Sequence, residues 1–250
     1  MTSTIFAANW KMHLGPGETR AFLDTFLPGY DARTDREVWF FPPAVSIEAA
    51  ATHVGDRGDI RVGAQNVYWE PQGAFTGEAS VGMIRAAGGR VVLVGHSERR
   101  HVFGETDDET AKKVRAVMAA DMVPVLCVGE QLAEREAGDT LAVVHRQLGA
   151  VEGLEAGALE RVIIAYEPVW AIGTGATATP ADAATVHAAI RSWMTARGAA
   201  PSAVRILYGG SVKPGNAEEL LAEQEIDGVL VGGASVQPDS WTQICAVPLN

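Results

Sequence analysis

The chain is poor in cysteine, and this excludes one class of protein at once. Its 250 residues include only Cys127 and Cys245, too few for a disulfide framework and suited to a reducing compartment. No apolar run approaches the ~18 residues needed to cross a membrane. Residues 1–4 lack the basic segment and the cleavage site of a secretory signal. We therefore expect a soluble, cytoplasmic protein.

Positive charge is also scarce. The chain has 20 Lys and Arg against 31 Asp and Glu, which gives a formal net charge of −11. This balance argues against a nucleic-acid-binding surface, and no basic cluster offsets it, because Lys112 and Lys113 lie among acids on a predicted solvated helix face. An anionic substrate would have to be held by a few local groups.

The chain contains no linker, low-complexity segment or repeated sequence period that would divide it. Short apolar runs, each predicted to be a strand, recur at residues 5–9, 38–41, 60–65, 91–95, 123–128, 162–166, 204–207 and 227–231. A helix is predicted after each of them, including helices capped by Ser46, spanning residues 131–149 and starting at Pro214. Eight strand–helix units favour an α/β fold, a single-domain (β/α)₈ barrel over residues 1–250, rather than an open doubly wound sheet.

The carboxyl ends of the strands in such a barrel meet at one face, where active sites lie. Polar groups and glycines at or just beyond the predicted strand ends are Asn9, Lys11, Gln65, His96, Cys127, Glu167, Ser211 and the pair Gly232 and Gly233. Any one of them has a simpler explanation, because loops begin at strand ends. The whole set together indicates a functional site.

Glu167 ends the sixth strand and precedes an unusual loop. Pro168 cannot continue the ladder, and the apolar residues 169–172 follow on what must be a loop, so we expect this loop to cover something. A carboxylate under an apolar lid suits a general base, because partial desolvation raises its pKa toward neutrality. The predicted lid consists of Pro168, Val169, Trp170, Ala171, Ile172, Gly173, Thr174, Gly175 and Ala176.

His96 directly follows the fourth strand, so its ring is predicted to project from the barrel rim as a proton donor or electrophile. A buried structural histidine is the alternative. Glu98 and His101 could join it as metal ligands, but no further His or Cys cluster has ligand spacing, so we expect no metal. Ser97 lacks the Gly-x-Ser-x-Gly elbow of a hydrolase nucleophile.

An anion pocket is predicted near Lys11. Glycine-rich turns follow the seventh and eighth strands at residues 209–211 and 232–233, where barrels commonly bind phosphate through backbone N–H groups. Residues 173–178 superficially match a dinucleotide fingerprint, but they do not directly follow a strand and no acid ends a strand ~20 residues later. We therefore expect no cofactor.

The loop of residues 67–78 carries Tyr68, Trp69 and Phe75 together with two glycines. Large apolar residues on a projecting loop suggest an interface. A loop packed on its own side chains would look the same in the sequence, so both interpretations stay open.

Six segments, in chain order, resemble the triosephosphate isomerase family. They are residues 9–12 (NWKM), 73–78 (GAFTGE), 95–100 (GHSERR), 165–175 (AYEPVWAIGTG), 208–212 (YGGSV) and 231–235 (VGGAS). The resemblance spans the whole chain and implies a TIM barrel that interconverts dihydroxyacetone phosphate and glyceraldehyde 3-phosphate without cofactor or metal. The family is a standard example of a catalytic Glu–His pair and of loop closure over a site.

The resemblance also implies a role for each candidate. Glu167 would move the proton between two substrate carbons, neutral His96 would polarise the carbonyl, and Glu98 would support the site. Substrate contacts would come from Asn9, Lys11, Gly173, Ser211, Gly232 and Gly233, with Ile172 and Leu230 enclosing the carboxylate. The chain would form a homodimer through the loop with Phe75 and Thr76, placing Thr76 near the partner subunit's Asn9 and the partner subunit's Lys11.

Three departures from the usual family pattern occur: Ala176 stands where Lys is common, His13 where Asn is common, and residues 236–237 read Val-Gln in place of Leu-Lys. None is a proposed catalytic group, although Ala176 falls at the second hinge of the lid. Two alternatives remain at this point. One is an isomerase of another small phosphosugar such as a tetrulose phosphate, and the other is a catalytically silent barrel used for binding.

Overall fold

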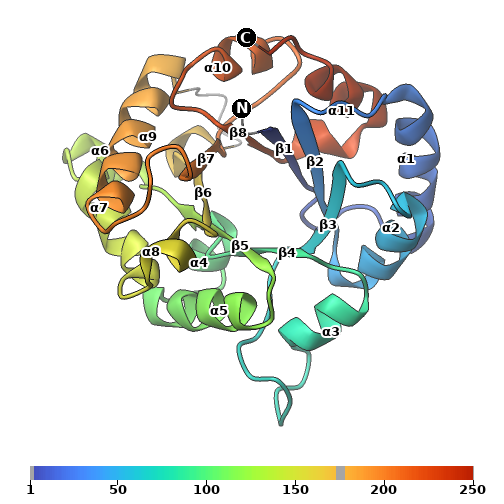
Figure 1. The fold of residues 1–250 in the computed structure, drawn as a ribbon, viewed down its shortest axis with the longest axis horizontal. Coiled ribbons are helices and arrows are strands. Elements are labelled where there is room, and N and C mark those ends of the chain that lie inside the picture. The colour runs from blue at the N-terminus through green and yellow to red at the C-terminus, as the bar shows by residue number, and fades with distance from the viewer. Residues whose placement is uncertain (1–2, 173–177, 250) are drawn as a thin grey trace.

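The computed structural model describes residues 3–172 and 178–249. Within these residues eight parallel strands close into a barrel in sequence order, with β1 paired to β8 (Figure 1). The strands are β1 (Thr4–Asn9), β2 (Arg36–Phe41), β3 (Ile60–Ala64), β4 (Val91–Val94), β5 (Val123–Val128), β6 (Ile163–Tyr166), β7 (Arg205–Tyr208) and β8 (Gly228–Val231). The predicted (β/α)₈ barrel is confirmed.

Helices surround the barrel as an outer ring (Figure 1). The α-helices are α1 (Pro16–Gly29), α2 (Ile47–Val54), α3 (Val81–Ala86), α4 (Ser97–His101), α5 (Asp107–Ala119), α6 (Leu132–Glu136), α7 (Thr140–Leu148), α8 (Ala156–Leu159), α9 (Pro180–Thr195), α10 (Ala217–Leu221) and α11 (Pro238–Cys245). Short 3₁₀ helices are η1 (Ala44–Ser46), η2 (Gly149–Val151), η3 (Val169–Ala171) and η4 (Gly233–Val236). None of the helices in the described residues is both long and apolar enough to cross a membrane.

The strands are buried on both faces because alternate side chains enter two different cores. In β1, Ile5 and Ala7 belong to the cluster that fills the barrel, whereas Phe6 and Ala8 pack with the layer beneath the helices. Alternate side chains of the β-branched and aromatic runs that predicted the strands therefore pack into one core or the other. A filled barrel leaves its loops at the carboxyl-terminal face as the place for a site.

Three predicted helix details are wrong. Residues 131–149 form two α-helices, since Gly138 adopts a left-handed φ of 80° between α6 and α7. Ser46 occupies the N-cap position of α2, but its hydroxyl donates to the Leu14 carbonyl and makes no capping hydrogen bond. The helix predicted from Pro214 begins only at Ala217, after a turn.

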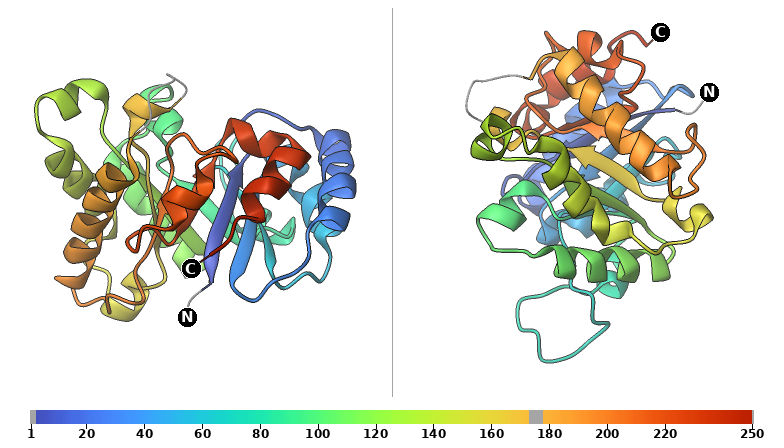
Figure 2. Two further views of the ribbon diagram at one scale, coloured as in Figure 1. Left: turned by 90° about the horizontal axis from the view of Figure 1, so that it is seen from above. Right: turned by 90° about the vertical axis from the view of Figure 1, so that its left-hand side faces the viewer.

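The segment between β3 and α3 extends away from the barrel as a long loop (Figures 1 and 2). Its base is closed by the Tyr68 N–H, which donates to the Ala79 carbonyl. The Tyr68 ring packs against Trp69 and Phe75 at centroid distances of 4.0 and 4.4 Å. The loop thus has an aromatic core of its own, yet Phe75 stays 38 % exposed.

Candidate active site

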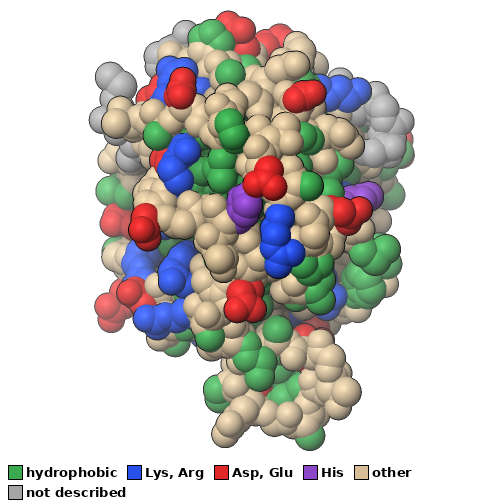
Figure 3. Space-filling model, turned by 90° about the vertical axis from the view of Figure 1, so that its right-hand side faces the viewer, with side chains coloured by type: hydrophobic (Ala, Val, Ile, Leu, Met, Phe, Trp, Pro, Cys, Tyr) green, Lys and Arg blue, Asp and Glu red, His purple; other side chains and the backbone are tan. Residues whose placement is uncertain are grey.

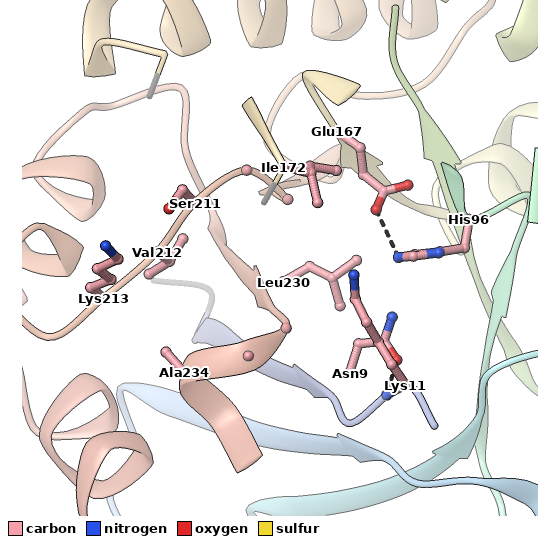
Figure 4. A pocket seen from close by; sticks show the side chains of 14 residues that line it. Asn9, Lys11, His96, Glu167, Ile172, Ser211, Val212, Lys213, Leu230 and Ala234 are labelled. Carbon is pink, nitrogen blue, oxygen red and sulfur yellow. Dashed lines mark hydrogen bonds and ion pairs between the residues drawn. The ribbon is translucent and has the colours of Figure 1, made fainter. Parts of the chain in front are cut away.

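A cavity of about 240 Å³ opens at the carboxyl ends of the strands. Its lining residues are Asn9, Lys11, His96, Glu167, Ile172, Gly209, Gly210, Ser211, Val212, Lys213, Leu230, Gly232, Gly233 and Ala234 (Figure 4). Pockets for drug-sized ligands usually exceed about 300 Å³, so this one suits a small molecule. Every predicted substrate-contacting residue in the described part of the chain lies in its wall.

Glu167 and His96 face each other across one end of this cavity (Figure 4). Glu167 Oε1 lies 3.0 Å from His96 Nε2, and the residues are only 2 % and 6 % exposed. The Ser97 backbone N–H donates to Glu167 Oε2 at 2.9 Å, and the Ser97 hydroxyl donates to Oε1 at 3.4 Å. The two oxygens of the carboxylate are therefore fixed by neighbours from α4.

The expectation that desolvation raises the pKa of Glu167 is wrong for this arrangement. Burial does raise it, but the charge and hydrogen bond of His96 and the Ser97 N–H together outweigh burial and hold the pKa below its ordinary value. The carboxylate is thus ionised at neutral pH. Three of its about four lone-pair positions are used by Ser97 and His96, so a substrate contact competes with these hydrogen bonds.

The backbone at the start of α4 fixes the tautomer of His96. His96 is the N-cap residue, and its Nδ1 accepts the Glu98 N–H at 3.3 Å, so the ring proton lies on Nε2, facing Glu167. Burial lowers the pKa of His96, while the facing Glu167 carboxylate raises it above its ordinary value. When Glu167 takes up a proton, that raising influence disappears. The imidazole is then favoured in its neutral form, with an N–H available to the cavity.

Lys11 follows β1 in a left-handed backbone conformation, with a φ of 49°. This conformation is costly for a residue with a side chain, and it is held by two hydrogen bonds. The Lys11 N–H donates to Asn9 Oδ1 at 3.0 Å, and Gln65 Nε2 donates to the Lys11 carbonyl at 2.7 Å. Gln65 therefore supports the site from β3. The Lys11 ammonium pairs with Glu98 Oε1 at 2.6 Å.

The other end of the cavity is formed by the turns after β7 and β8. Ser211, Gly232 and Gly233 line it, and Ile172 and Leu230 supply apolar walls. A side chain at Gly232 would bring its Cβ within 3.2 Å of Lys11 Cε, so glycine lets the lysine lie over the turn. Of the predicted lid, Gly173, Thr174, Gly175 and Ala176 lie outside the described residues.

The first part of the predicted lid is attached to Glu130, a fully buried acid that follows β5. Glu130 Oε1 accepts the Trp170 indole N–H at 2.9 Å, and the Tyr166 hydroxyl donates to both carboxylate oxygens. The Arg135 guanidinium lies 4.4 Å from the centre of the Trp170 ring. The indole is therefore fixed by a polar contact on its edge and a cation on its face.

Two predicted strand-end candidates, Gln65 and Cys127, do not line the cavity. Cys127 points into the barrel core, and burial raises the pKa of its thiol well above the ordinary value, so it is chemically inert. His101, which the sequence offered as a possible metal ligand, lies at the end of α4 and is not among the lining residues either. In the residues that the structure describes, no group of three His, Cys, Asp or Glu side chains could hold a metal ion.

Sequence reasoning missed Ser97, Glu130 and Lys213 as parts of the site. Ser97 adjoins His96, which was the available signal, but only the fold reveals that its N–H faces Glu167. Glu130 follows the fifth strand without any motif. Lys213 comes two residues after Ser211, so the glycine-rich turn was the signal for it.

A family model described as triosephosphate isomerase matches residues 4–247. The chain belongs to the triosephosphate isomerase family. It is 49% identical to the triosephosphate isomerase of Moorella thermoacetica over 246 residues, which cover 98% of each chain. It is 47% identical to that of Roseiflexus sp. (strain RS-1) over 247 residues, 98% of this chain and 97% of the relative. It is 48% identical to that of Solibacter usitatus over 248 residues, 98% of this chain and 99% of the relative.

These relatives give no support to a tetrulose phosphate isomerase or a silent binding barrel. The departures from the family pattern that the structure describes also lie outside the cavity wall. His13 is exposed, and neither it nor residues 236–237 line the cavity. The departure at residue 176 lies outside the described residues.

Proposed function

We propose that the chain interconverts dihydroxyacetone phosphate and D-glyceraldehyde 3-phosphate by proton transfer through an enediolate, with Glu167 and His96 as the reacting pair. The observation that carries this proposal is the 3.0 Å approach of His96 Nε2 to Glu167 Oε1 in a cavity whose opposite wall contains Ser211, Gly232 and Gly233. The acid–base pair and the phosphate-sized end thus flank one small substrate. Membership of the family supports this reaction.

Glu167 acts as the base that removes a proton from one substrate carbon and returns it to the next. Its carboxylate leaves the Ser97 N–H to do so, because both of its oxygens are engaged without substrate. The Nε2–H of His96, which faces Glu167 in the structure, then donates to the oxygens of the enediolate. Proton transfer by a positioned carboxylate requires neither cofactor nor metal.

Asn9 and Lys11 contact the substrate oxygens, and Lys11 supplies positive charge. Glu98 supports the site by holding the Lys11 ammonium at 2.6 Å. The phosphate binds to Ser211, Gly232 and Gly233, whose small side chains let the backbone N–H groups approach it closely. Gly173 completes this phosphate site from the lid.

Residues 168–176 form a lid over the intermediate. Its apolar residues exclude water, which would otherwise compete for protons and break down the intermediate. Ile172 already lines the cavity beside Glu167, and Trp170 is fixed by Glu130. Closure would therefore carry Ile172 further over the carboxylate.

Replacing Glu167 with Gln tests the reaction. Because the amide cannot accept the substrate proton, we expect kcat to fall by at least ~10²–10⁴-fold while the fold is retained. A coupled assay with both triose phosphates measures the loss, and circular dichroism measures folding. Glu152→Gln, at an exposed position that pairs with Arg197, is the matched control. Near-normal turnover by Glu167→Gln would sink the assignment.

The proposed assembly is a homodimer in which the loop with Phe75 and Thr76 enters a second copy. Supporting it, most of the strongly exposed large apolar side chains lie on segments after β1 to β4: Met12, Val45, Phe75, Met83, Val102 and Phe103. Figure 3 shows hydrophobic side chains on the protruding loop and on the neighbouring face of the body. Patches of this kind mark protein interfaces.

A recipient for the loop lies beside the first cavity. A second cavity, of about 220 Å³, shares Asn9, Lys11 and His96 with it, and Met12 and Phe103 form part of its apolar wall. A loop tip from a second copy that filled this cavity would lie against Lys11. Thr76 would then contact the partner subunit's Asn9 and the partner subunit's Lys11, so dimerisation would complete each site.

The chain is further proposed to work as one domain over residues 1–250 in the cytoplasm. Pairing of β1 with β8 joins the two halves of the chain in one barrel, which supports a single domain. Cys127 and Cys245 are free and buried, as suits a reducing compartment.

A further inference from the structure

Lys213 lies at the rim of the cavity with a charge that no acid neutralises. It follows Ser211 and Val212 after β7, and its side chain is exposed. Among the described residues, no carboxylate lies within ion-pair distance of its ammonium. Figure 4 shows Lys213 on the Ser211 side of the cavity, opposite Glu167 and His96. A cation in this position lies near the end of the cavity proposed to bind the phosphate, and far from the reacting carbons.

The other lysines of the chain are already paired. The sequence contains four lysines, Lys11, Lys112, Lys113 and Lys213. Lys112 pairs with Asp108 at 2.7 Å and Lys113 with Glu105 at 2.6 Å, both on or beside α5. The ammonium of Lys11 is 2.6 Å from Glu98. Lys213 alone among them brings positive charge that no acid in the described residues offsets.

Lys213 balances the negative charge around the cavity. Apart from His96, the charged side chains that line the cavity or pair with its lining are Lys11 and Lys213 against Glu98 and Glu167. Without Lys213, one negative charge would remain, on a protein whose formal net charge is −11. A doubly charged phosphate ester would then be repelled both by the site and by the whole molecule.

The backbone of Lys213 is fixed relative to the phosphate end. Its N–H donates to Asn216 Oδ1 at 2.7 Å, and Asn216 Nδ2 donates to the Ser211 carbonyl at 3.0 Å. One asparagine therefore ties the base of the lysine to the turn that contains Ser211. The side chain beyond this anchor is free to follow an incoming anion.

We propose that Lys213 is the capture residue for the phosphate-bearing substrate. Its ammonium attracts the dianion to the rim and raises the rate at which it enters, and it makes no contact with the reacting carbons. This inference rests on the proposed function. Triosephosphate isomerase is a standard example of an enzyme whose kcat/KM approaches the diffusional ceiling, so a slower capture should appear directly in that ratio.

The test compares Lys213→Met with the wild-type chain at two ionic strengths. At ~10 mM salt we expect kcat/KM to fall roughly three- to tenfold with kcat changed less than twofold, and inorganic phosphate to inhibit more weakly. At ~1 M salt, where the screening length falls from about 30 Å to about 3 Å, the two proteins should agree. Lys213→Arg should restore wild-type kcat/KM. Lys112→Met, which removes an equal charge on α5, is the matched control.

Each outcome has a separate meaning. An unchanged kcat/KM at low salt, a loss that persists at high salt, or an equal loss in Lys112→Met would overturn the role of Lys213. These results would leave the proposed isomerase intact, because the wild-type chain would still turn over triose phosphates. Absence of wild-type turnover would instead contradict the proposed function itself.

Discussion

Gly232 lies beneath the Lys11 side chain. Because glycine has no side chain, it leaves the space that the lysine occupies. A methyl group there would lie 3.2 Å from Lys11 Cε, which is closer than most such contacts, and 3.8 Å from Lys11 Nζ. We expect Gly232→Ala to displace the ammonium and lower kcat/KM about tenfold, equivalent to ~1.4 kcal/mol. Steady-state kinetics measures this, and Gly215→Ala, where nothing lies within 4 Å of the new methyl, is the control. Equal kinetics for both variants would contradict the contact.

His187 on α9 is expected to make the protein sensitive to acid. Burial lowers its pKa to about 4, its Nδ1–H donates to the Glu225 carbonyl at 3.0 Å, and in the described residues its Nε2 has no hydrogen-bond partner. The unfolded chain binds a proton near pH 6.5, whereas the folded chain does not until about pH 4. Stability from this group is therefore complete above pH 6.5 and falls as the pH drops toward 4.

The loss should reach roughly 3 kcal/mol, from 1.36 kcal/mol for each pKa unit. Urea unfolding at pH 7.5 and 4.5 measures it in the wild-type chain and in His187→Gln, which removes the titrating group. We expect the variant to lose much less stability between these two values. His53→Gln, a partly exposed histidine paired with Asp24, should keep the wild-type dependence. Parallel pH profiles for all three proteins would exclude His187 as the cause.

Among the elements, α9 joins the proposed lid to the barrel through its first turn. The Thr179 hydroxyl accepts the Asp182 N–H, and Asp182 accepts the Thr179 N–H and hydroxyl. Thr106 and Glu109 form the same capping box on α5, which does not adjoin the lid in the chain. The two helix starts are thus chemically equivalent, but only Thr179 directly follows the lid segment.

This equivalence allows a matched experiment. Removing an N-cap hydroxyl costs ~1 kcal/mol, so Thr179→Ala and Thr106→Ala should each lower the Tm by about 2–4 °C. Only Thr179→Ala should also change kcat, because only it loosens the end of the lid. Thermal unfolding and turnover measured on the same samples separate the two effects. A kcat change of the same size in Thr106→Ala would show that the change in Thr179→Ala does not come from the lid.

At this scale the sequence predicts element type better than element boundaries. Apolar runs and turn residues located all eight strands, because barrel strands are buried on both faces and leave a plain signal. Gly138 divides α6 from α7 through its left-handed backbone, which composition alone did not reveal. The strand-end rule found Glu167 and His96, but Ser97 and Glu130 act through neighbours distant in sequence. Only the folded chain brings those neighbours together.

For the whole molecule, the proposed dimer explains two features that a monomer leaves without purpose. The loop between β3 and α3 packs its aromatic residues on one another and still exposes Phe75. The cavity of about 220 Å³ beside Lys11 is open to solvent in the single chain. Insertion of the loop of one chain into this cavity of a second chain would bury both Phe75 and the cavity. It would also place the second chain against Lys11. Activity should then depend on assembly.

Phe75→Asp tests this dependence. A buried charge without a partner opposes association, so we expect the variant to sediment near 26.4 kDa while the wild-type chain sediments at about twice that mass. Because Lys11 would lose its contact with the partner loop, turnover should fall at least ~10-fold in the monomer, with less effect at high protein concentration. Leu132→Asp changes an exposed leucine on α6, away from the proposed interface, and should alter neither property. A wild-type chain that sediments as a monomer with full activity would exclude the dimer, and a fully active Phe75→Asp monomer would separate assembly from catalysis.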